Sequence, residues 1–337
     1  MKVSFLVTYY NQREYVKQSM DSILAIDKPC DWEILVGDDG SSDGTIEEVN
    51  RYVEQYPEKI KLYVMPRESE KKYDSVRRAS ANRLNILEKC SGDIFCTLDG
   101  DDFFCDIEFV KEAIEIFREN SDISVVAFGF KYFQETVFCR DYTLPSDMNY
   151  QIVDKTMYLE KLYLPAGGCV HRKAFGKERI DYIKKLGCFD DNNIVINSLN
   201  YGEMYAVNRP IYAYRQTGQS VYTSMNNLEQ AVLNVQGMDA DIRLVDDSLQ
   251  DVIKKRYATA VITMYIWRKE IRSILGEDKC LKYEDGCKSL IPSYCYDLLS
   301  YSDLCSERKK ELNSFLNLNK KYTIKQCIKY YLRGVIR

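Results

Sequence analysis

Hydrophobic and polar positions alternate in blocks over the first hundred residues, and the blocks predict strands that alternate with helices. Buried strands are predicted at four short apolar runs, residues 3–7, 33–36, 60–64 and 94–98. Amphipathic helices are predicted at 12–25, 45–55 and 79–90, where apolar side chains recur every three or four positions. This order predicts an α/β fold with a mostly parallel sheet flanked by helices. The charged residues 68–78 are expected to form a loop or an exposed helix start.

Three polar clusters follow strands of this predicted sheet. They are residues 8–11, 38–41 and 99–102. Ligands bind at the carboxyl ends of the strands in such sheets, so the clusters should meet at one edge. The third cluster holds three carboxylates within four positions, which a fold tolerates only if they face water or share a cation. A solvated acidic turn and a site for Mg²⁺ or Mn²⁺ are therefore the two interpretations.

The pattern changes from about residue 226, where apolar residues follow helical spacing and glycines and prolines become rare. A helical C-terminal region is predicted over 226–318, and it could hold a homodimer interface. Six basic residues and no acidic ones lie between Lys320 and Arg337, interleaved with apolar and aromatic residues. This segment, 319–337, predicts a basic amphipathic helix that can lie on an anionic membrane surface. An ordinary solvated helix or a disordered tail is the alternative.

Composition narrows the class of protein mainly by exclusion. The 337 residues are 45% apolar, enough for a large domain with an appendage, and the net charge of −4 argues against nucleic acid as a partner. One histidine and twelve scattered cysteines without a C-x-x-C pair argue against zinc and for reduced thiols. The first residues lack the apolar run of a signal peptide, and no run approaches the ~20 apolar residues of a membrane span. A cytoplasmic protein is expected, peripheral at the inner face of the cell membrane if the basic helix binds there.

Three segments of the sequence together resemble the family 2 glycosyltransferases of GT-A fold. They are "VSFLVTYYNQREYVKQSMDSIL", "EILVGDDGSSDGT" and "CSGDIFCTLDGDDFF". The family pattern is a strand ending in Tyr-Asn, then Asp-Asp-Gly-Ser-x-Asp-x-Thr, then Gly-x-Tyr-Ile-x-x-x-Asp-x-Asp-Asp, and its order and spacing match over about the first 105 residues. Thr8 stands where many relatives have proline, and Phe103-Phe104 replaces a more usual aromatic pair. The resemblance implies a GT-A catalytic domain at 1–225, with a nucleotide-sugar-binding half at 1–105 and an acceptor half at 106–225.

The resemblance assigns the first two clusters to the nucleotide sugar. Thr8, Tyr10 and Asn11 would line the nucleotide pocket. Asp39 would accept a hydrogen bond from the base, most simply the imide N–H of uracil, because a carboxylate only accepts. Arg83 is a weaker candidate for the diphosphate.

The resemblance assigns the third cluster to the metal. Asp101 would be the main ligand of Mn²⁺ or Mg²⁺, and Asp99 would lie near the ribose or the same ion. Asp102 could hold a metal-bound water or a neighbouring backbone group. Arg215 could face the diphosphate or, equally, pair with a structural carboxylate.

The acceptor side is marked by Asp190 and Asp191, which precede a helix predicted at 194–199. Transfer to a hydroxyl needs a carboxylate that takes the proton, and the resemblance implies Asp191 for this role, with Asp190 as the alternative. The segment "YAYRQTGQS" further on resembles the Tyr-Arg-x-x-x-x-Ser of the family. The simpler interpretation is that both carboxylates only cap the helix. His171, the single histidine, is expected to be packed or exposed rather than a metal ligand.

These assignments predict an inverting, metal-dependent glycosyltransferase. It would move a sugar from a nucleoside diphosphate, most simply a UDP-sugar, to a hydroxyl of a glycan or lipid-linked glycan, as in bacterial capsule or O-antigen synthesis. Two alternatives stay open. A nucleotidyltransferase that makes nucleotide sugars is disfavoured, because "TYYNQREY" contains no glycine for a phosphate loop. A non-catalytic relative would bind a nucleotide or a partner without turnover.

Overall fold

The computed structural model of the chain describes residues 1–68, 75–142, 144, 150–161, 164–217, 227–250 and 253. The chain divides into two units, Met1–Val221 and Tyr222–Arg337. The described part of the second unit contains helix α9 (Asn227–Leu244) and the 3₁₀ turn η3 (Asp247–Leu249). Most of the predicted helical region 226–318, and the whole basic segment 319–337, lie outside the described residues. No helix of the described part is both long and apolar enough to cross a membrane.

The first half of the N-terminal unit alternates strands and helices, as the hydrophobic pattern predicts. Its elements are β1 (Lys2–Tyr9), α1 (Arg13–Ala25), β2 (Asp31–Asp38), α2 (Thr45–Gln55), β3 (Ile60–Val64), α3 (Ser75–Leu87) and β4 (Ile94–Asp99). Helix α3 begins at Ser75, so the end of the charged segment 68–78 is already helical. Consecutive residues of β1 are buried from Val3 to Val7, because helices cover both faces of the strand.

The second half of this unit adds shorter elements that extend the sheet. They are β5 (Phe103–Phe104), α4 (Phe109–Glu119), β6 (Ile123–Gln134), β7 (Val137–Tyr142), β8 (Gln151–Val153), α5 (Lys155–Lys161), η2 (Ala166–Gly168), β9 (Cys169–Arg172), α6 (Lys177–Leu186), α7 (Asp191–Leu199) and β10 (Glu203–Arg215). Strand β9 runs antiparallel between β4 and β6, while β6 and β10 are parallel. The predicted α/β fold with a central helix-flanked sheet is confirmed, and the second half makes the sheet mixed.

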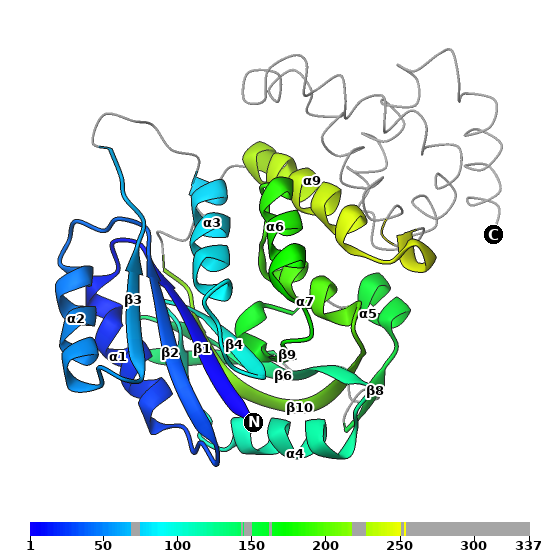
Figure 1. Ribbon diagram of the computed structural model, residues 1–337, viewed down its shortest axis with the longest axis horizontal. Helices are drawn as coiled ribbons and strands as arrows, with labels where there is room; N and C mark the ends of the chain where they lie inside the picture. The colour runs from blue at the N-terminus through cyan, green and yellow to red at the C-terminus, as the bar shows by residue number, and fades with distance from the viewer. Residues whose placement is uncertain are drawn as a thin grey trace. The chain divides into compact units, whose positions relative to one another are not determined.

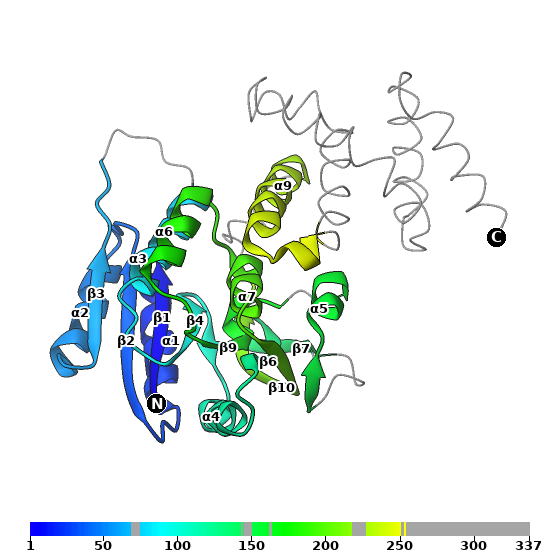
Figure 2. The ribbon, with the colours of Figure 1, turned by 45° about the vertical axis from the view of Figure 1, so that its right-hand side comes forward.

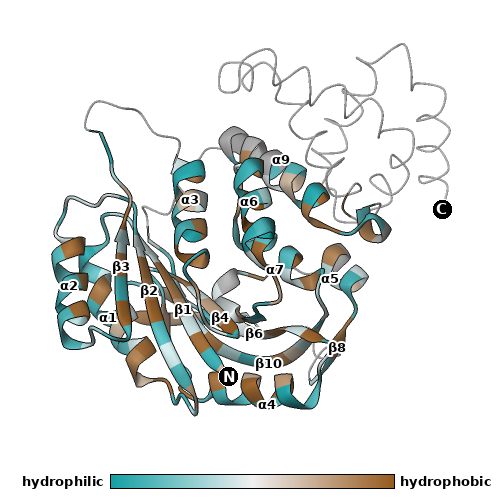
Figure 3. Cartoon of the chain, viewed as in Figure 1, coloured by the Kyte–Doolittle hydropathy of each residue, from teal (hydrophilic) through white to brown (hydrophobic). Residues whose placement is uncertain are grey.

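The strand order β3-β2-β1-β4-β9-β6-β10-β5 places a topological switch between β1 and β4. Helices α1, α2 and α4 cover one face of the sheet, and α3, α6 and α7 cover the other (Figures 1 and 2). Hydrophobic residues gather on the strands and on the helix surfaces turned toward them (Figure 3). Strands β1, β2, β3 and β4 are parallel, so their carboxyl ends share one edge, where ligands of such sheets bind.

His171 lies on β9 and is fully buried. Its ring stacks on Phe95, with centroids 4.9 Å apart, and its Nδ1 lies 3.0 Å from Oγ of Ser198. Burial lowers the pKa of His171 to about 3, so the ring is neutral at physiological pH. Of the two expected environments, packed or exposed, the structure shows the packed one.

This buried ring should make folding depend on pH. An unfolded histidine has a pKa of about 6.5 and takes up a proton that the folded chain does not bind until its pKa of about 3. The unfolded state therefore gains protons first, and stability falls as the pH drops through 6.5 toward 3. We expect His171 alone to remove about 2 kcal/mol of the free energy of unfolding between pH 7 and pH 5.

Urea unfolding at both pH values checks this, with His171→Gln as the comparison. The glutamine protein has no imidazole, so its loss of stability on acidification should be smaller by that amount. Equal losses in the two proteins would show that folded His171 takes up its proton over the same pH range as an unfolded histidine, against the lowered pKa.

Candidate active site

The carboxyl ends of the parallel strands bring the three predicted polar clusters together. Thr8 is in register with Asp99 across β1 and β4, and its Oγ1 donates to Asp99 Oδ1 at 3.2 Å. The backbone N–H of Asn11 donates to Oγ of Ser41 at 2.8 Å, which ties the first cluster to the second. Residues separated by up to 91 positions thus form one edge.

Asp39 is held by two arginines that the sequence analysis did not select. Arg67 and Arg78 both form ion pairs with its carboxylate, whose side chain is only 6% exposed. Arg67 also donates from Nε to the backbone carbonyl of Asp39 at 2.6 Å, and its guanidinium lies 3.9 Å from the ring centroid of Tyr10. A ligand that reaches Asp39 therefore meets hydrogen-bond donors beside the acceptor that was predicted. The sequence did carry one signal for this contact. Both arginines follow β3, and β3 lies beside β2, the strand that Asp39 follows.

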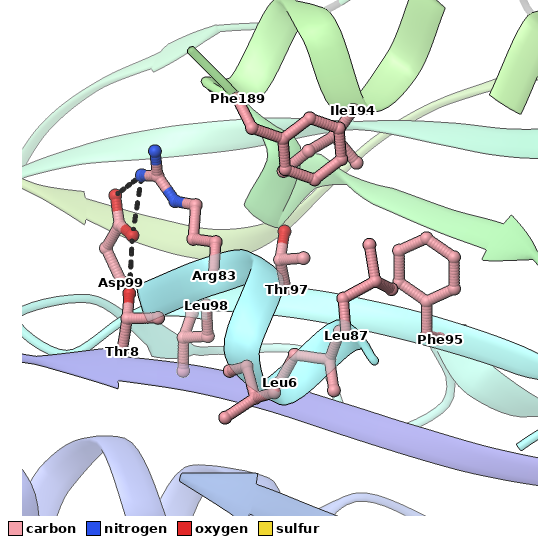
Figure 4. Close-up of a pocket in the computed structure, with 11 residues that line it drawn as sticks. Leu6, Thr8, Arg83, Leu87, Phe95, Thr97, Leu98, Asp99, Phe189 and Ile194 are labelled. Atoms are coloured by element: carbon pink, nitrogen blue, oxygen red, sulfur yellow. Dashed lines mark hydrogen bonds and ion pairs between the residues drawn. The ribbon is translucent and has the colours of Figure 1, made fainter. Parts of the chain in front are cut away.

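Arg83 on α3 joins the strand edge to the start of α7. Its Nη2 donates to Oδ1 and Oδ2 of Asp99 at 2.9 and 3.0 Å, and it lies 3.3 Å from Oδ1 of Asp191 (Figure 4 shows the Asp99 contact). Burial opposes the charge of Arg83, but the carboxylates of Asp99, Asp191 and Asp190 outweigh it and raise the pKa of the guanidinium. Donor-side and acceptor-side residues that were predicted separately meet at this one cation.

The end of the acidic turn is fixed by Arg215. The backbone N–H of Arg215 donates to Oδ1 of Asp102 at 2.7 Å, and its Nε donates to the carbonyl of Asp101 at 2.6 Å. Its Nη2 donates to Oε1 of Gln18 at 2.6 Å, and the guanidinium packs against the ring of Tyr15. The contacts of Arg215 and Asp102 described here are structural, and a role of Arg215 toward a diphosphate stays a prediction.

Two carboxylates of this turn, Asp101 and Asp102, have a raised pKa. Burial, and then the charge of Asp99, raise the pKa of Asp101 to about 6. Burial and both neighbouring charges raise the pKa of Asp102 as well. The turn packs closely, since a Cβ on Gly100 would lie 2.1 Å from the ring of Tyr9. A bound cation would offset the repulsion between the carboxylates of this turn.

The donor set fits a divalent cation that a diphosphate helps to hold. Within the described residues, no group of three His, Cys, Asp or Glu side chains is placed to hold a metal ion by itself. Asp101 and Asp99 offer hard oxygen ligands at a strand end, and the side chain of Asp99 is 41% exposed. Mg²⁺-type sites commonly use one or two carboxylates and complete their shell with phosphate oxygens and water.

Asp190 and Asp191 have separate environments at the start of α7. Asp190 is the N-cap: its Oδ1 accepts from the N–H of Asn193 at 2.9 Å, and its own N–H donates to Asn193 Oδ1 at 3.0 Å. Burial raises the pKa of Asp190. Asp191 is the first helical residue, is 21% exposed and contacts Arg83. Capping therefore accounts for Asp190, whereas the role of Asp191 as a base stays a prediction.

Tyr214 on β10 lies near the carboxylates of the site and was not selected from the sequence. Burial raises its pKa, and the charges of Asp102 and Asp191 add to the effect. Its ring packs against Phe130 and Tyr132, with centroids 5.9 and 6.0 Å away. Its position next to Arg215 in the segment "YAYRQTGQS" was the available signal.

A family comparison agrees with this geometry. Residues 4–181, more than half of the chain, match the sequence model of glycosyl transferase family 2. The chain belongs to this family. The family 2 match begins at β1 and ends within α6, so it includes the three strand-end clusters and stops before Asp191.

Individual family 2 relatives and solved structures are more distant. A putative glycosyltransferase of Bacillus subtilis, EpsE, is 28% identical over 134 residues, 40% of this chain and 45% of EpsE. TuaG of the same organism, a putative teichuronic acid biosynthesis glycosyltransferase, is 24% identical over 64% of this chain and 87% of TuaG. The chain spans only 32–45% of the length of the first curated relatives it matches. The crystal structure of Staphylococcus aureus TarS 1-349 with UDP-GlcNAc has a TM-score of 0.58 at 16% identity, covering 99% of this chain and 90% of that one. This likeness concerns the fold.

Proposed function

We propose that this family 2 protein is an inverting, metal-dependent glycosyltransferase whose donor is a nucleoside diphosphate sugar. Within this class we propose a UDP-sugar. The observation that carries the proposal is Arg83, which contacts Asp99 at the strand edge and Asp191 at the start of α7. A donor held at the edge would therefore lie next to a carboxylate able to serve an acceptor. Two solved complexes of structural relatives support a nucleotide sugar as the donor. They are TarS with UDP-GlcNAc and a Pyrobaculum calidifontis mannosyltransferase with GDP-Man and Mn²⁺.

The donor would lie across the ends of β1, β2 and β4. Asp39 would accept a hydrogen bond from the base. Arg67 and Arg78 would donate hydrogen bonds to the carbonyl groups of the base or to a phosphate. Asp101, with Asp99, would hold the divalent cation, which stabilises the departing diphosphate. Arg83 would keep Asp99 in place from the other side.

Asp191 would be the base. As the acceptor oxygen forms its bond to the anomeric carbon, the bond from that carbon to the diphosphate oxygen breaks, and the acceptor proton passes to the carboxylate. Attack from the face opposite the diphosphate inverts the anomeric configuration. Asp191 would take this proton on a carboxylate that also contacts Arg83 through Oδ1.

The acceptor would be a hydroxyl of a glycan or of a lipid-linked glycan. The name of TuaG places that relative in teichuronic acid biosynthesis, which supports surface polysaccharide synthesis as the setting. A peripheral place at the inner face of the membrane, through the basic residues of 320–337, belongs to the proposal and awaits a vesicle-binding measurement.

Thermal unfolding with a panel of nucleotides, with and without Mn²⁺, tests the proposal. A ligand that binds only the folded state at about 100 times its Kd adds about 2.7 kcal/mol to the free energy of unfolding. We expect a rise of several degrees with UDP that requires Mn²⁺. A rise with another nucleoside diphosphate would change the donor and keep the mechanism. No rise with any nucleotide would favour a protein that does not bind a donor, against the proposal.

A further inference from the structure

A small pocket lies beside the Arg83–Asp99 pair, between strands β1 and β4 and helices α3 and α7. Its cavity volume is about 10 Å³, room for one water-sized or methyl-sized group. Thr8, Arg83 and Asp99 form its polar end, and Figure 4 shows them together on one side. The rest of the wall is apolar and includes Leu6, Leu87, Phe95, Phe189 and Ile194. The polar end is reachable, since the Asp99 side chain is 41% exposed.

Thr97 places one hydroxyl inside this apolar wall. It lies on β4, two residues before Asp99 and on the same face of the strand. Its Oγ1 is buried and has no hydrogen-bond partner among the described residues, and the residue is 9% exposed. Figure 4 shows it between the Arg83–Asp99 pair and Leu87, below Phe189 and Ile194. Leaving a buried hydroxyl unpaired is unfavourable, so the pocket is suited to a ligand that brings the missing partner.

We propose that this pocket receives the methyl end of the donor's acetamido group, so that the transferred sugar is a 2-acetamido-2-deoxyhexose. The inference rests on the proposed function, because it needs a donor sugar held at Asp99 and Arg83. The methyl of an acetamido group matches the small apolar space, and its amide supplies the partner that Thr97 lacks. A sugar hydroxyl would instead carry a polar group into apolar walls with a single partner. A water would have the same difficulty, since buried waters usually make about three hydrogen bonds.

Isothermal titration with matched donors tests the inference in the wild-type protein. UDP-GlcNAc and UDP-glucose differ only in the 2-substituent, as do UDP-GalNAc and UDP-galactose, and UDP alone reports the nucleotide site. With Mn²⁺ present, we expect the acetamido donors to bind at least about 10-fold tighter than their hydroxyl counterparts, from methyl burial and one hydrogen bond.

Two substitutions at Thr97 separate binding from folding. Thr97→Val keeps the shape and removes the unpaired hydroxyl, so the thermal midpoint of the free protein should stay or rise by about 1–3 °C. The same change should reduce the preference for acetamido donors by about 3–10-fold and leave the Kd of UDP unchanged. Thr97→Ile extends into the cavity and should remove the preference. Ser124→Ala, which deletes a buried hydroxyl on β6, is the matched control and should change neither preference nor UDP binding.

The outcomes distinguish this inference from the proposed function. If UDP binds and the wild-type protein treats UDP-GlcNAc and UDP-glucose alike, the acetamido pocket is wrong and the proposed function stands. An unchanged preference in Thr97→Val together with Thr97→Ile has the same meaning. If neither UDP nor any UDP-sugar binds, the UDP-sugar assignment itself fails and the inference fails with it. If Thr97→Ile does not fold, Thr97→Val decides.

Discussion

The Asp191→Asn protein should lose glycosyl transfer by about 10²–10⁴-fold in kcat, the usual contribution of a positioned general base. Asparagine keeps the shape of the side chain but cannot accept a proton. The first turn of α7 should survive, because the capping bonds come from Asp190 and Asn193. UDP should bind with wild-type affinity, since Arg83 keeps both of its bonds to Asp99. Release of UDP from the donor found by the thermal screen, with a glycan acceptor or with water, measures the loss.

Asp190→Asn is the matched control for this prediction. Asparagine is about as good an N-cap as aspartate, so the helix start should remain, and turnover should fall by less than about 10-fold. The reverse pattern, with activity lost in Asp190→Asn and kept in Asp191→Asn, would assign the base to Asp190. Full activity in both variants would remove the carboxylate-base mechanism.

The Asp101→Asn protein should lose the metal dependence of donor binding. A cation at this turn stabilises the departing diphosphate by several kcal/mol, so turnover should fall by about 10²-fold or more, and the Mn²⁺-dependent rise of the thermal midpoint with UDP should disappear. The free protein should be at least as stable as the wild type, because burial and the charge of Asp99 already raise the pKa of Asp101 to about 6. Removing metal from the wild-type protein with a chelator should reproduce the loss.

Asp122→Asn serves as the control for charge removal. Asp122 is exposed and lies just before the first residue of β6. Arg215 and the acidic turn lie at the other end of this strand. Mn²⁺ and UDP should therefore stabilise this variant as they stabilise the wild type. If Asp99→Asn rather than Asp101→Asn removes the metal dependence, Asp99 is the main ligand. A metal effect that survives in both variants would falsify the cation site at this turn.

Much of the first half of the site follows from local patterns. Apolar runs of strand length, separated by amphipathic stretches, predict parallel strands because a long crossover, usually a helix, returns the chain to the same edge. Polar residues directly after such strands must then share that edge. This is why Thr8, Asn11, Asp39 and Asp99 could be selected from the sequence and placed together, and why the glycosyltransferase family could be recognised from their order.

The contacts that join the site could not be predicted in the same way. The periodicity around Arg83 predicts a helix. It does not predict that the guanidinium contacts Asp99 and also Asp191, which lies 108 positions after Arg83 in the sequence. Arg67 and Arg78 belong to a charged stretch whose pattern fits solvent equally well, although both side chains contact Asp39. Each depends on how an element packs, which hydrophobic spacing does not specify.

The sequence was enough to predict the α/β class, the edge at which the polar clusters lie and the family to which the chain belongs. These follow from local alternation and from motifs, which act over a few residues. Packing made Asp190 the cap of α7, brought Asp191 to Arg83 and placed Thr97 in an apolar pocket beside Asp99. It also decided that β9 separates β4 from β6. Hydrophobic patterns show which face of an element is covered, whereas only the packed chain shows what covers it.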